Sequence, residues 1–218
     1  MRDFADSFLR DPALDARGVR HGFGLRTSLE LPLRKPRQVH GARVVWASVS
    51  NELGEADAVL TRERAVRVGV FSADCVPILI AASGAVGAVH AGWRGCAAGV
   101  IENALDELAR AAPGAEIVAA IGPCIGACCY EVDAPVLAPL RARYGSLLDC
   151  AITPTRPEHA HLDLGLLAQF ALARAGVAPA AIGTAARVCT RCDAARFHSH
   201  RRDAAAAGRL AHWIEAPA

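Results

Sequence analysis

A cysteine and a histidine lie at the two ends of one apolar stretch, SADCVPILIAASGAVGAVHAGWRG. Two runs of β-branched and small apolar residues, 76–82 and 85–89, flank a Ser-Gly dipeptide, and this pattern predicts a β-hairpin with a two-residue turn. In the register that such a turn sets, Pro77 lies opposite His90, and Cys75 becomes the diagonal neighbour of His90 on the same face.

Diagonal positions of a hairpin lie about 7 to 8 Å apart at Cα, and their side chains can converge. A thiolate and an imidazole that meet in this way suit either metal binding or a Cys-His nucleophile pair, in which the imidazole lowers the pKa of the thiol. A third interpretation involves no chemistry, with Cys75 a small buried hydrophobic residue and His90 a hydrogen-bonded core residue. The two residues alone leave all three interpretations open.

Positive charge follows the hairpin directly. The segment HAGWRG carries Arg94 and leads into a predicted helix over residues 95–112. The free backbone N–H groups of Gly95 to Ala97, at the start of that helix, would join Arg94 in holding an anion within reach of His90. The alternative is a glycine-rich turn chosen for tight packing, with Arg94 on the surface.

A sheet and several helices must position these side chains. Helices are expected over residues 95–112, 133–144 and 165–176. Besides the hairpin, strands are expected over residues 19–22, 38–46, 58–61, 66–71, 116–121, 161–164 and 185–188. Because strands and helices alternate irregularly and include a hairpin, the pattern predicts an α+β fold with a mixed sheet covered by helices.

Composition narrows the class of protein. The 218 residues are 53% hydrophobic with a formal net charge of +2, and we expect residues 1–218 to form a single globular domain. Charges of both signs are spread along the chain without a basic run, so nucleic acid is not an expected partner. The first twenty residues lack the apolar core of a signal peptide, and no apolar run reaches the roughly 20 residues of a membrane span, so we expect a cytoplasmic protein. Its eight cysteines are then expected to be reduced.

Six segments together resemble the laccase-domain family, also called multicopper polyphenol oxidase-like proteins. They are RQVHGARVV, ADAVLT, SADCVPILI, GAVHAGWRG, IGPCIGACCYEV and CTRCDAARFHSHRRD. The resemblance runs from about residue 21 to residue 214 and implies an α+β layered sandwich similar to cysteine hydrolases of the cytotoxic-necrotizing-factor type. It also implies a catalytic zinc held by His40, Cys75 and His90. Two imidazoles and one thiolate suit zinc, and three protein ligands leave a fourth position for water or substrate.

The resemblance implies a purine nucleoside phosphorylase, with related adenosine deaminase and methylthioadenosine phosphorylase activities. Its expected partners are purine nucleosides and inorganic phosphate, and its expected assembly is a monomer or small homo-oligomer. Candidate phosphate or substrate holders are arginines, whose guanidinium groups suit phosphate oxygens. They are Arg26, Arg94, Arg201 and Arg202, with Arg209 in the same cluster as the last two.

Two other functions remain as alternatives. One is a copper-dependent polyphenol oxidase, although two H-x-H pairs, eight histidines in all and a single methionine at position 1 do not make a full laccase site. The other is a thiol hydrolase that uses Cys75 and His90 without a metal. Metal content separates these alternatives from a zinc enzyme.

The sequence departs from the family pattern in two places. A longer glycine-rich loop usually follows HGFGLR, whereas only TSLELPLRKPR precedes QVH here, and His200 occupies a position that is commonly tyrosine. The segments CIGACC and CTRC hold five further cysteines and could in principle form a second metal site. One CxxC without a second well-spaced pair is a weak metal signal, so these cysteines are interpreted as reduced thiols that line or support the pocket. These are Cys124, Cys128, Cys129, Cys189 and Cys192.

Overall fold

The computed structural model describes residues 7–216 and has a six-stranded mixed sheet at its centre. In order across the sheet, the strands are β12 (Ile182–Gly183), β8 (Val118–Ile121), β6 (Val76–Ala82), β7 (Ala85–Ala91), β4 (Ala58–Thr61) and β3 (Val44–Trp46). β3 and β4 are parallel, as are β12 and β8, whereas the pairs between them are antiparallel.

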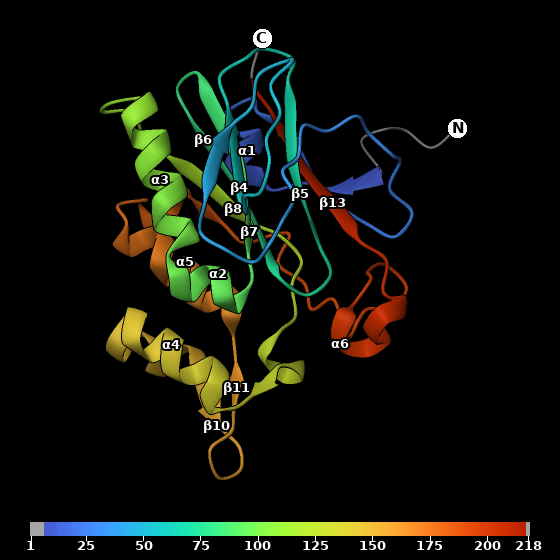
Figure 1. Cartoon of the computed structure of the whole chain (residues 1–218), viewed down its shortest axis with the longest axis vertical. Helices are drawn as coiled ribbons and strands as arrows, with labels where there is room; N and C mark the ends of the chain where they lie inside the picture. The colour runs from blue at the N-terminus through green and yellow to red at the C-terminus, as the bar shows by residue number, and fades with distance from the viewer. Residues whose placement is uncertain (1–6, 217–218) are drawn as a thin grey trace.

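Helices cover one face of this sheet and a second sheet packs on the other (Figure 1). The helices on the first face are α3 (Val100–Ala111) and α5 (Leu164–Arg174). The second sheet has four strands in the order β1 (Phe8–Leu9), β2 (Arg20–Gly24), β13 (Leu210–Glu215) and β5 (Arg67–Ser72). This arrangement confirms the predicted α+β layered fold with a mixed sheet.

The remaining elements lie around these layers. A three-stranded sheet in the order β10 (Ile152–Pro154), β11 (Ala160–Leu162) and β9 (Glu131–Val132) extends from one end with α4 (Ala134–Tyr144). Short helices are α1 (Pro12–Asp15), α2 (Trp93–Ala98), α6 (His200–Asp203), η2 (Ala127–Cys129), η3 (Gly145–Ala151), η4 (Pro179–Ala181) and η5 (Ala204–Ala206). Between residues 7 and 216 no helix combines the length and the apolar character needed to cross a membrane.

The hairpin has the predicted register. Ala82 pairs with Ala85 across a turn in which Gly84 adopts a φ of +74°, and Pro77 lies opposite His90. Nearly every residue of β6 and β7 is buried, since both strands lie inside the sheet between the helices and the second sheet. The apolar runs therefore reflect burial on both faces.

The predicted helix over residues 95–112 is two helices. α2 begins at Trp93, two residues earlier than predicted, and ends at Ala98. Gly99, with a φ of +90°, separates it from α3. The Cys96 N–H donates to the Gly92 carbonyl at 2.9 Å. That group is consequently not among the free donors at the start of the helix, contrary to the sequence expectation.

Two predicted strands differ because their backbone N–H groups find other partners. In the 38–46 segment only β3 is a strand, since the N–H groups of residues 39, 40 and 41 donate to the Asp57 carboxylate. The 185–188 segment is irregular, because the Ala185 N–H donates to the Asp11 carboxylate and the Arg187 N–H closes a turn on Thr184. Its place at the sheet edge is taken by β12.

Candidate metal centre and its cavity

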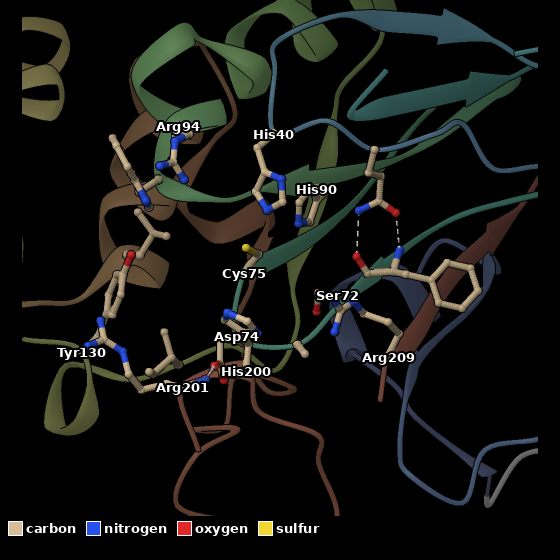
Figure 2. A pocket seen from close by; sticks show the side chains of 16 residues that line it. His40, Ser72, Asp74, Cys75, His90, Arg94, Tyr130, His200, Arg201 and Arg209 are labelled. Atoms are coloured by element: carbon tan, nitrogen blue, oxygen red, sulfur yellow. Dashed lines mark hydrogen bonds between the residues drawn. The ribbon is translucent and has the colours of Figure 1, made fainter. Parts of the chain in front are cut away.

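His40, Cys75 and His90 converge from three separate parts of the chain. Cys75 directly precedes β6 and His90 lies on β7, so the hairpin brings them together, while His40 comes from the loop before β3. One ligand atom of each residue lies within 4.8 Å of those of the other two. The His40 and His90 rings meet edge to face with centroids 4.9 Å apart (Figure 2). The three donors face one point, as a three-ligand metal site requires.

Asp57 positions both histidines. It is fully buried, and its Oδ1 accepts a hydrogen bond from His90 Nδ1 at 2.8 Å and from the His40 N–H at 2.9 Å. Its Oδ2 accepts from the Gly41 N–H at 2.7 Å. Because Nδ1 of His90 donates to this carboxylate, Nε2 is left free to accept a metal. His40 has a φ of +60°, and the hydrogen bonds from the loop backbone to Asp57 stabilise this conformation.

Proton affinities at the site reflect this network. Burial alone would raise the pKa of Cys75, yet hydrogen bonds from His40 and His90 outweigh it and lower that pKa to about 6. Burial alone would lower the pKa of His90, yet its hydrogen bonds to Asp57 and Cys75 raise it to about 9. Burial opposes ionisation of Asp57 as well, and the hydrogen bonds from His90, Gly41 and Val39 prevail and lower the pKa of that carboxyl. Both pKa shifts favour a thiolate on Cys75 and an imidazolium on His90, and a bound metal would displace the proton from Nε2 of that ring.

Gly92 leaves room for the converging side chains. A Cβ at this position would lie 3.0 Å from Cys75 Sγ and 3.1 Å from His40 Cδ2. Both contacts are tighter than ordinary van der Waals distances, so a side chain here would displace the donors. The glycine therefore follows from the close approach of backbone to site.

The three donors open onto a cavity of about 750 Å³. Its wall includes Asp74 and Tyr130, neither of which the sequence analysis singled out as a site residue. Asp74 is buried with a φ of +88°, and its carboxylate accepts hydrogen bonds from Thr190 Oγ1 at 2.5 Å, Ser199 Oγ at 3.0 Å and the Arg201 N–H at 2.6 Å. It thereby ties the 190–201 segment to the residue beside Cys75. The signal that was available is a carboxylate directly before a ligand candidate in SADC.

The candidate arginines divide into two groups. Arg94, Arg201 and Arg209 line the cavity, as does His200 (Figure 2). Arg26 and Arg202 do not line it. The Arg26 guanidinium donates to the Ala194 carbonyl at 3.0 Å, and that of Arg202 pairs with Asp203 and donates to three backbone carbonyls. The guanidinium groups of Arg26 and Arg202 thus have partners within the protein.

None of the five further cysteines singled out in the sequence lines the cavity. Cys124 is buried, and the other four of these five gather into one compact cluster: Cys128, Cys129, Cys189 and Cys192. From the sequence, a second metal site formed by CIGACC and CTRC is the less favoured interpretation, because CTRC has no second CxxC to pair with. The structure brings CTRC together with the adjacent cysteines Cys128 and Cys129 instead.

Residues 20–216 match the family described as multi-copper polyphenol oxidoreductase laccase. The chain belongs to this family. The match spans nearly the whole described chain and includes all three donors of the candidate metal centre. It confirms the family resemblance that the motifs indicated.

Several relatives with 32% to 38% sequence identity are named for purine nucleoside chemistry. A protein of Xylella fastidiosa named purine nucleoside phosphorylase is 38% identical over 175 residues, which cover 77% of this chain and 66% of that relative. Purine nucleoside phosphorylase YlmD of Geobacillus stearothermophilus is 36% identical over 81% of this chain and 69% of its own length. A protein from an unknown prokaryotic organism, named adenosine deaminase RL5, is 32% identical over 89% of this chain and 79% of its own.

The fold is shared with solved family structures. The crystal structure of YlmD from Geobacillus stearothermophilus matches with a TM-score of 0.83 at 28% identity, covering 97% of this chain and 99% of that one. A hypothetical protein YfiH of Bacillus licheniformis matches with the same TM-score of 0.83 at 25% identity, covering 92% and 94%. The layered arrangement described above is therefore that of its family.

Proposed function

We propose that this protein is a zinc-dependent purine nucleoside phosphorylase. In this reaction a phosphate oxygen bonds to C1′ of the ribose while the bond from C1′ to the purine breaks, giving ribose 1-phosphate and the free base. The observation that carries the proposal is a three-donor site, His40, Cys75 and His90, at a cavity lined by three arginines. The names of the relatives support the same chemistry.

The donor set suits zinc. Two imidazoles and a thiolate are borderline and soft ligands, and their ligand atoms lie within 4.8 Å of one another. Asp57 accepts from Nδ1 of His90 and so directs Nε2 toward a metal. A zinc ion held by His40, Cys75 and His90 would supply Lewis-acid polarisation of an oxygen ligand at its fourth position. The lowered pKa of Cys75 favours the thiolate that a metal needs, whereas the raised pKa of His90 means that metal binding there releases a proton.

The cavity offers positive charge for phosphate, an aromatic side chain and enough volume for a nucleoside. Arg94, Arg201 and Arg209 surround it with positive charge, which attracts and orients a phosphate dianion against the sugar. Tyr130 offers an aromatic wall, and the Arg201 guanidinium lies 5.2 Å from the centroid of its ring. A volume of about 750 Å³ lies within the range of small-molecule sites and accommodates a nucleoside with phosphate.

Adenosine deamination is the second candidate. It needs a metal-activated water at C6 of the purine in place of phosphate at C1′, and the same three donors leave a position for that water. A relative named adenosine deaminase favours this activity. The two reactions differ in their need for phosphate, which makes them separable in one assay.

The test is product identification under controlled metal and phosphate. Metal-analysed protein is incubated with adenosine, inosine or methylthioadenosine, with and without phosphate, and the products are separated by chromatography. We expect free purine base only with phosphate, inosine from adenosine if deamination also occurs, and loss of turnover after chelation that zinc restores. Cys75→Ala should lose the zinc of the His40-Cys75-His90 centre and turnover together, whereas Cys150→Ala, which alters an exposed free cysteine, should keep both.

Other outcomes would support the alternatives. Full turnover by metal-free protein that is lost in Cys75→Ala would indicate the thiol hydrolase. Phenol oxidation that depends on copper and survives removal of zinc would indicate the polyphenol oxidase, although within residues 7–216 neither H-x-H pair joins a group of three or more ligating side chains. Either result would overturn the proposal.

A further inference from the structure

Four cysteine sulfurs gather outside the catalytic cavity. Cys128 and Cys129 lie on η2, and Cys189 and Cys192 lie in a turn some 60 residues later, where the structure brings the two segments side by side. The Sγ atom of Cys128 lies 3.6 Å from those of Cys129 and Cys192 and 3.7 Å from that of Cys189. Sγ of Cys129 lies 3.4 Å from that of Cys192.

These separations match the edges of a zinc-thiolate tetrahedron. A Zn–S bond of about 2.3 Å gives sulfur-sulfur edges of about 3.8 Å, while a disulfide would bring two sulfurs to about 2.05 Å. We propose that Cys128, Cys129, Cys189 and Cys192 bind one structural zinc ion, separate from the His40-Cys75-His90 centre. Four protein ligands close the coordination sphere, so this ion would bind no substrate.

The surrounding groups suit bound thiolates. The Gly126 N–H donates to Cys189 Sγ at 3.3 Å, and the Arg191 guanidinium lies 3.5 Å from Cys129 Sγ. Four thiolates around one Zn²⁺ carry a net negative charge, which an N–H donor and a neighbouring arginine stabilise. An isolated bridge between Cys124 and Cys189 already pairs the two segments through their backbones.

The proposed zinc would stabilise the part of the cavity wall that contains Tyr130 and Arg201. Tyr130 directly follows Cys129, and Arg201 lies ten residues after Arg191, in the segment that the CTRC turn begins. The two side chains stack, and Arg201 Nη2 also donates to the Glu131 carbonyl at 3.1 Å. A zinc ion that joins the two segments would keep the Tyr130 and Arg201 side chains together without contacting substrate.

The experiment isolates the proposed ion by using Cys75→Ala, which removes a ligand of the other centre. Zinc content is measured by mass spectrometry after exhaustive dialysis, and the protein is titrated with Co²⁺ alone. We expect one zinc per Cys75→Ala chain and, with Co²⁺, the charge-transfer absorption of tetrahedral thiolate coordination. Adding Cys192→Ser should abolish both signals, whereas adding Cys150→Ser should leave both unchanged.

Thiol accessibility gives a second readout if Cys192→Ser fails to fold. In Cys75→Ala, an alkylating reagent should label Cys128 and Cys192 slowly despite their exposure, and chelation should expose all four cluster thiols to rapid labelling. Labelling that chelation does not change, or a Co²⁺ spectrum without thiolate charge transfer, would overturn the proposal. Neither result would bear on turnover at the other centre, so failure here is distinct from failure of the proposed phosphorylase.

Discussion

At the scale of single residues, Asp57 positions two of the three candidate metal ligands although it does not line the cavity. Its carboxylate accepts hydrogen bonds from the ring of His90 and from the backbone N–H of His40. An amide at this position has one acceptor oxygen and would also point a donor at a neighbouring donor.

We therefore expect Asp57→Asn to weaken zinc binding at the His40-Cys75-His90 centre by roughly 10- to 100-fold, the range for loss of an outer-shell partner. The free energy of unfolding should fall by about 1 to 3 kcal/mol as buried donors lose their acceptor. Competition with a chromophoric chelator and urea denaturation measure the two effects. Asp106→Asn, an exposed change on α3, serves as the control, and equal zinc affinity in both variants would contradict this role.

The arginines make a second prediction at this scale. If phosphate binds beside the metal centre, Arg94→Ala should raise the apparent KM for phosphate by an amount equivalent to about 1 to 3 kcal/mol, the range for hydrogen bonds to charged groups. Arg26→Ala should leave it unchanged, because Arg26 does not line the cavity. Steady-state kinetics over a phosphate series provide the comparison. Equal effects of the two substitutions would show that Arg94 acts through the fold.

At the scale of elements, Gly99 decides how α2 and α3 meet. Its φ of +90° disfavours any side chain, and a Cβ would also collide with the Arg143 guanidinium, which pairs with Glu102 at 3.3 Å. Gly99→Ala should therefore cost more stability than Gly114→Ala, where φ is +72° and no atom lies within 4 Å of the added Cβ. We expect about 1 kcal/mol for Gly114→Ala and more for Gly99→Ala by urea denaturation. Equal losses would mean that Arg143 moves without penalty.

Elements that depend on nearby sequence could be predicted, and those that depend on distant partners could not. The hairpin register followed from its own turn, and α5 from its own apolar pattern. The loop around His40 looked like a strand because its acceptor, Asp57, lies 17 residues away. β13 was also missed, and its partners β2 and β5 are remote in sequence. The cysteine cluster likewise joins segments about 60 residues apart.

At the scale of the whole molecule, a buried histidine makes stability depend on pH. His212 is fully buried on β13, accepts the Gly24 N–H at Nδ1 and contacts Ser72 Oγ through Nε2 at 2.9 Å. Burial lowers the pKa of His212 to about 3 from its ordinary value of 6.5. The unfolded chain therefore binds a proton below about pH 6.5 that the folded chain does not.

The free energy of unfolding should consequently fall as pH drops from about 6.5 toward 3, with His212 contributing up to about 1.4 kcal/mol per pH unit. His212→Gln removes this proton uptake, so its stability should decline less steeply over the same window, from a lower starting value. Urea denaturation in chelator at several pH values measures the slopes. His200→Gln, which changes an exposed histidine, should keep the original slope, and an unaltered slope in His212→Gln would refute the assignment.

The order of strands in the central sheet also bears on aggregation. Its longest and most apolar strands, β6 and β7, lie inside, whereas the strands at its two edges, β3 and β12, have only three and two residues. An edge this short offers few unpaired N–H and C=O groups to a strand from another molecule. The sequence most prone to intermolecular β-pairing is thus shielded by its own neighbours, and it becomes accessible only when the sheet opens.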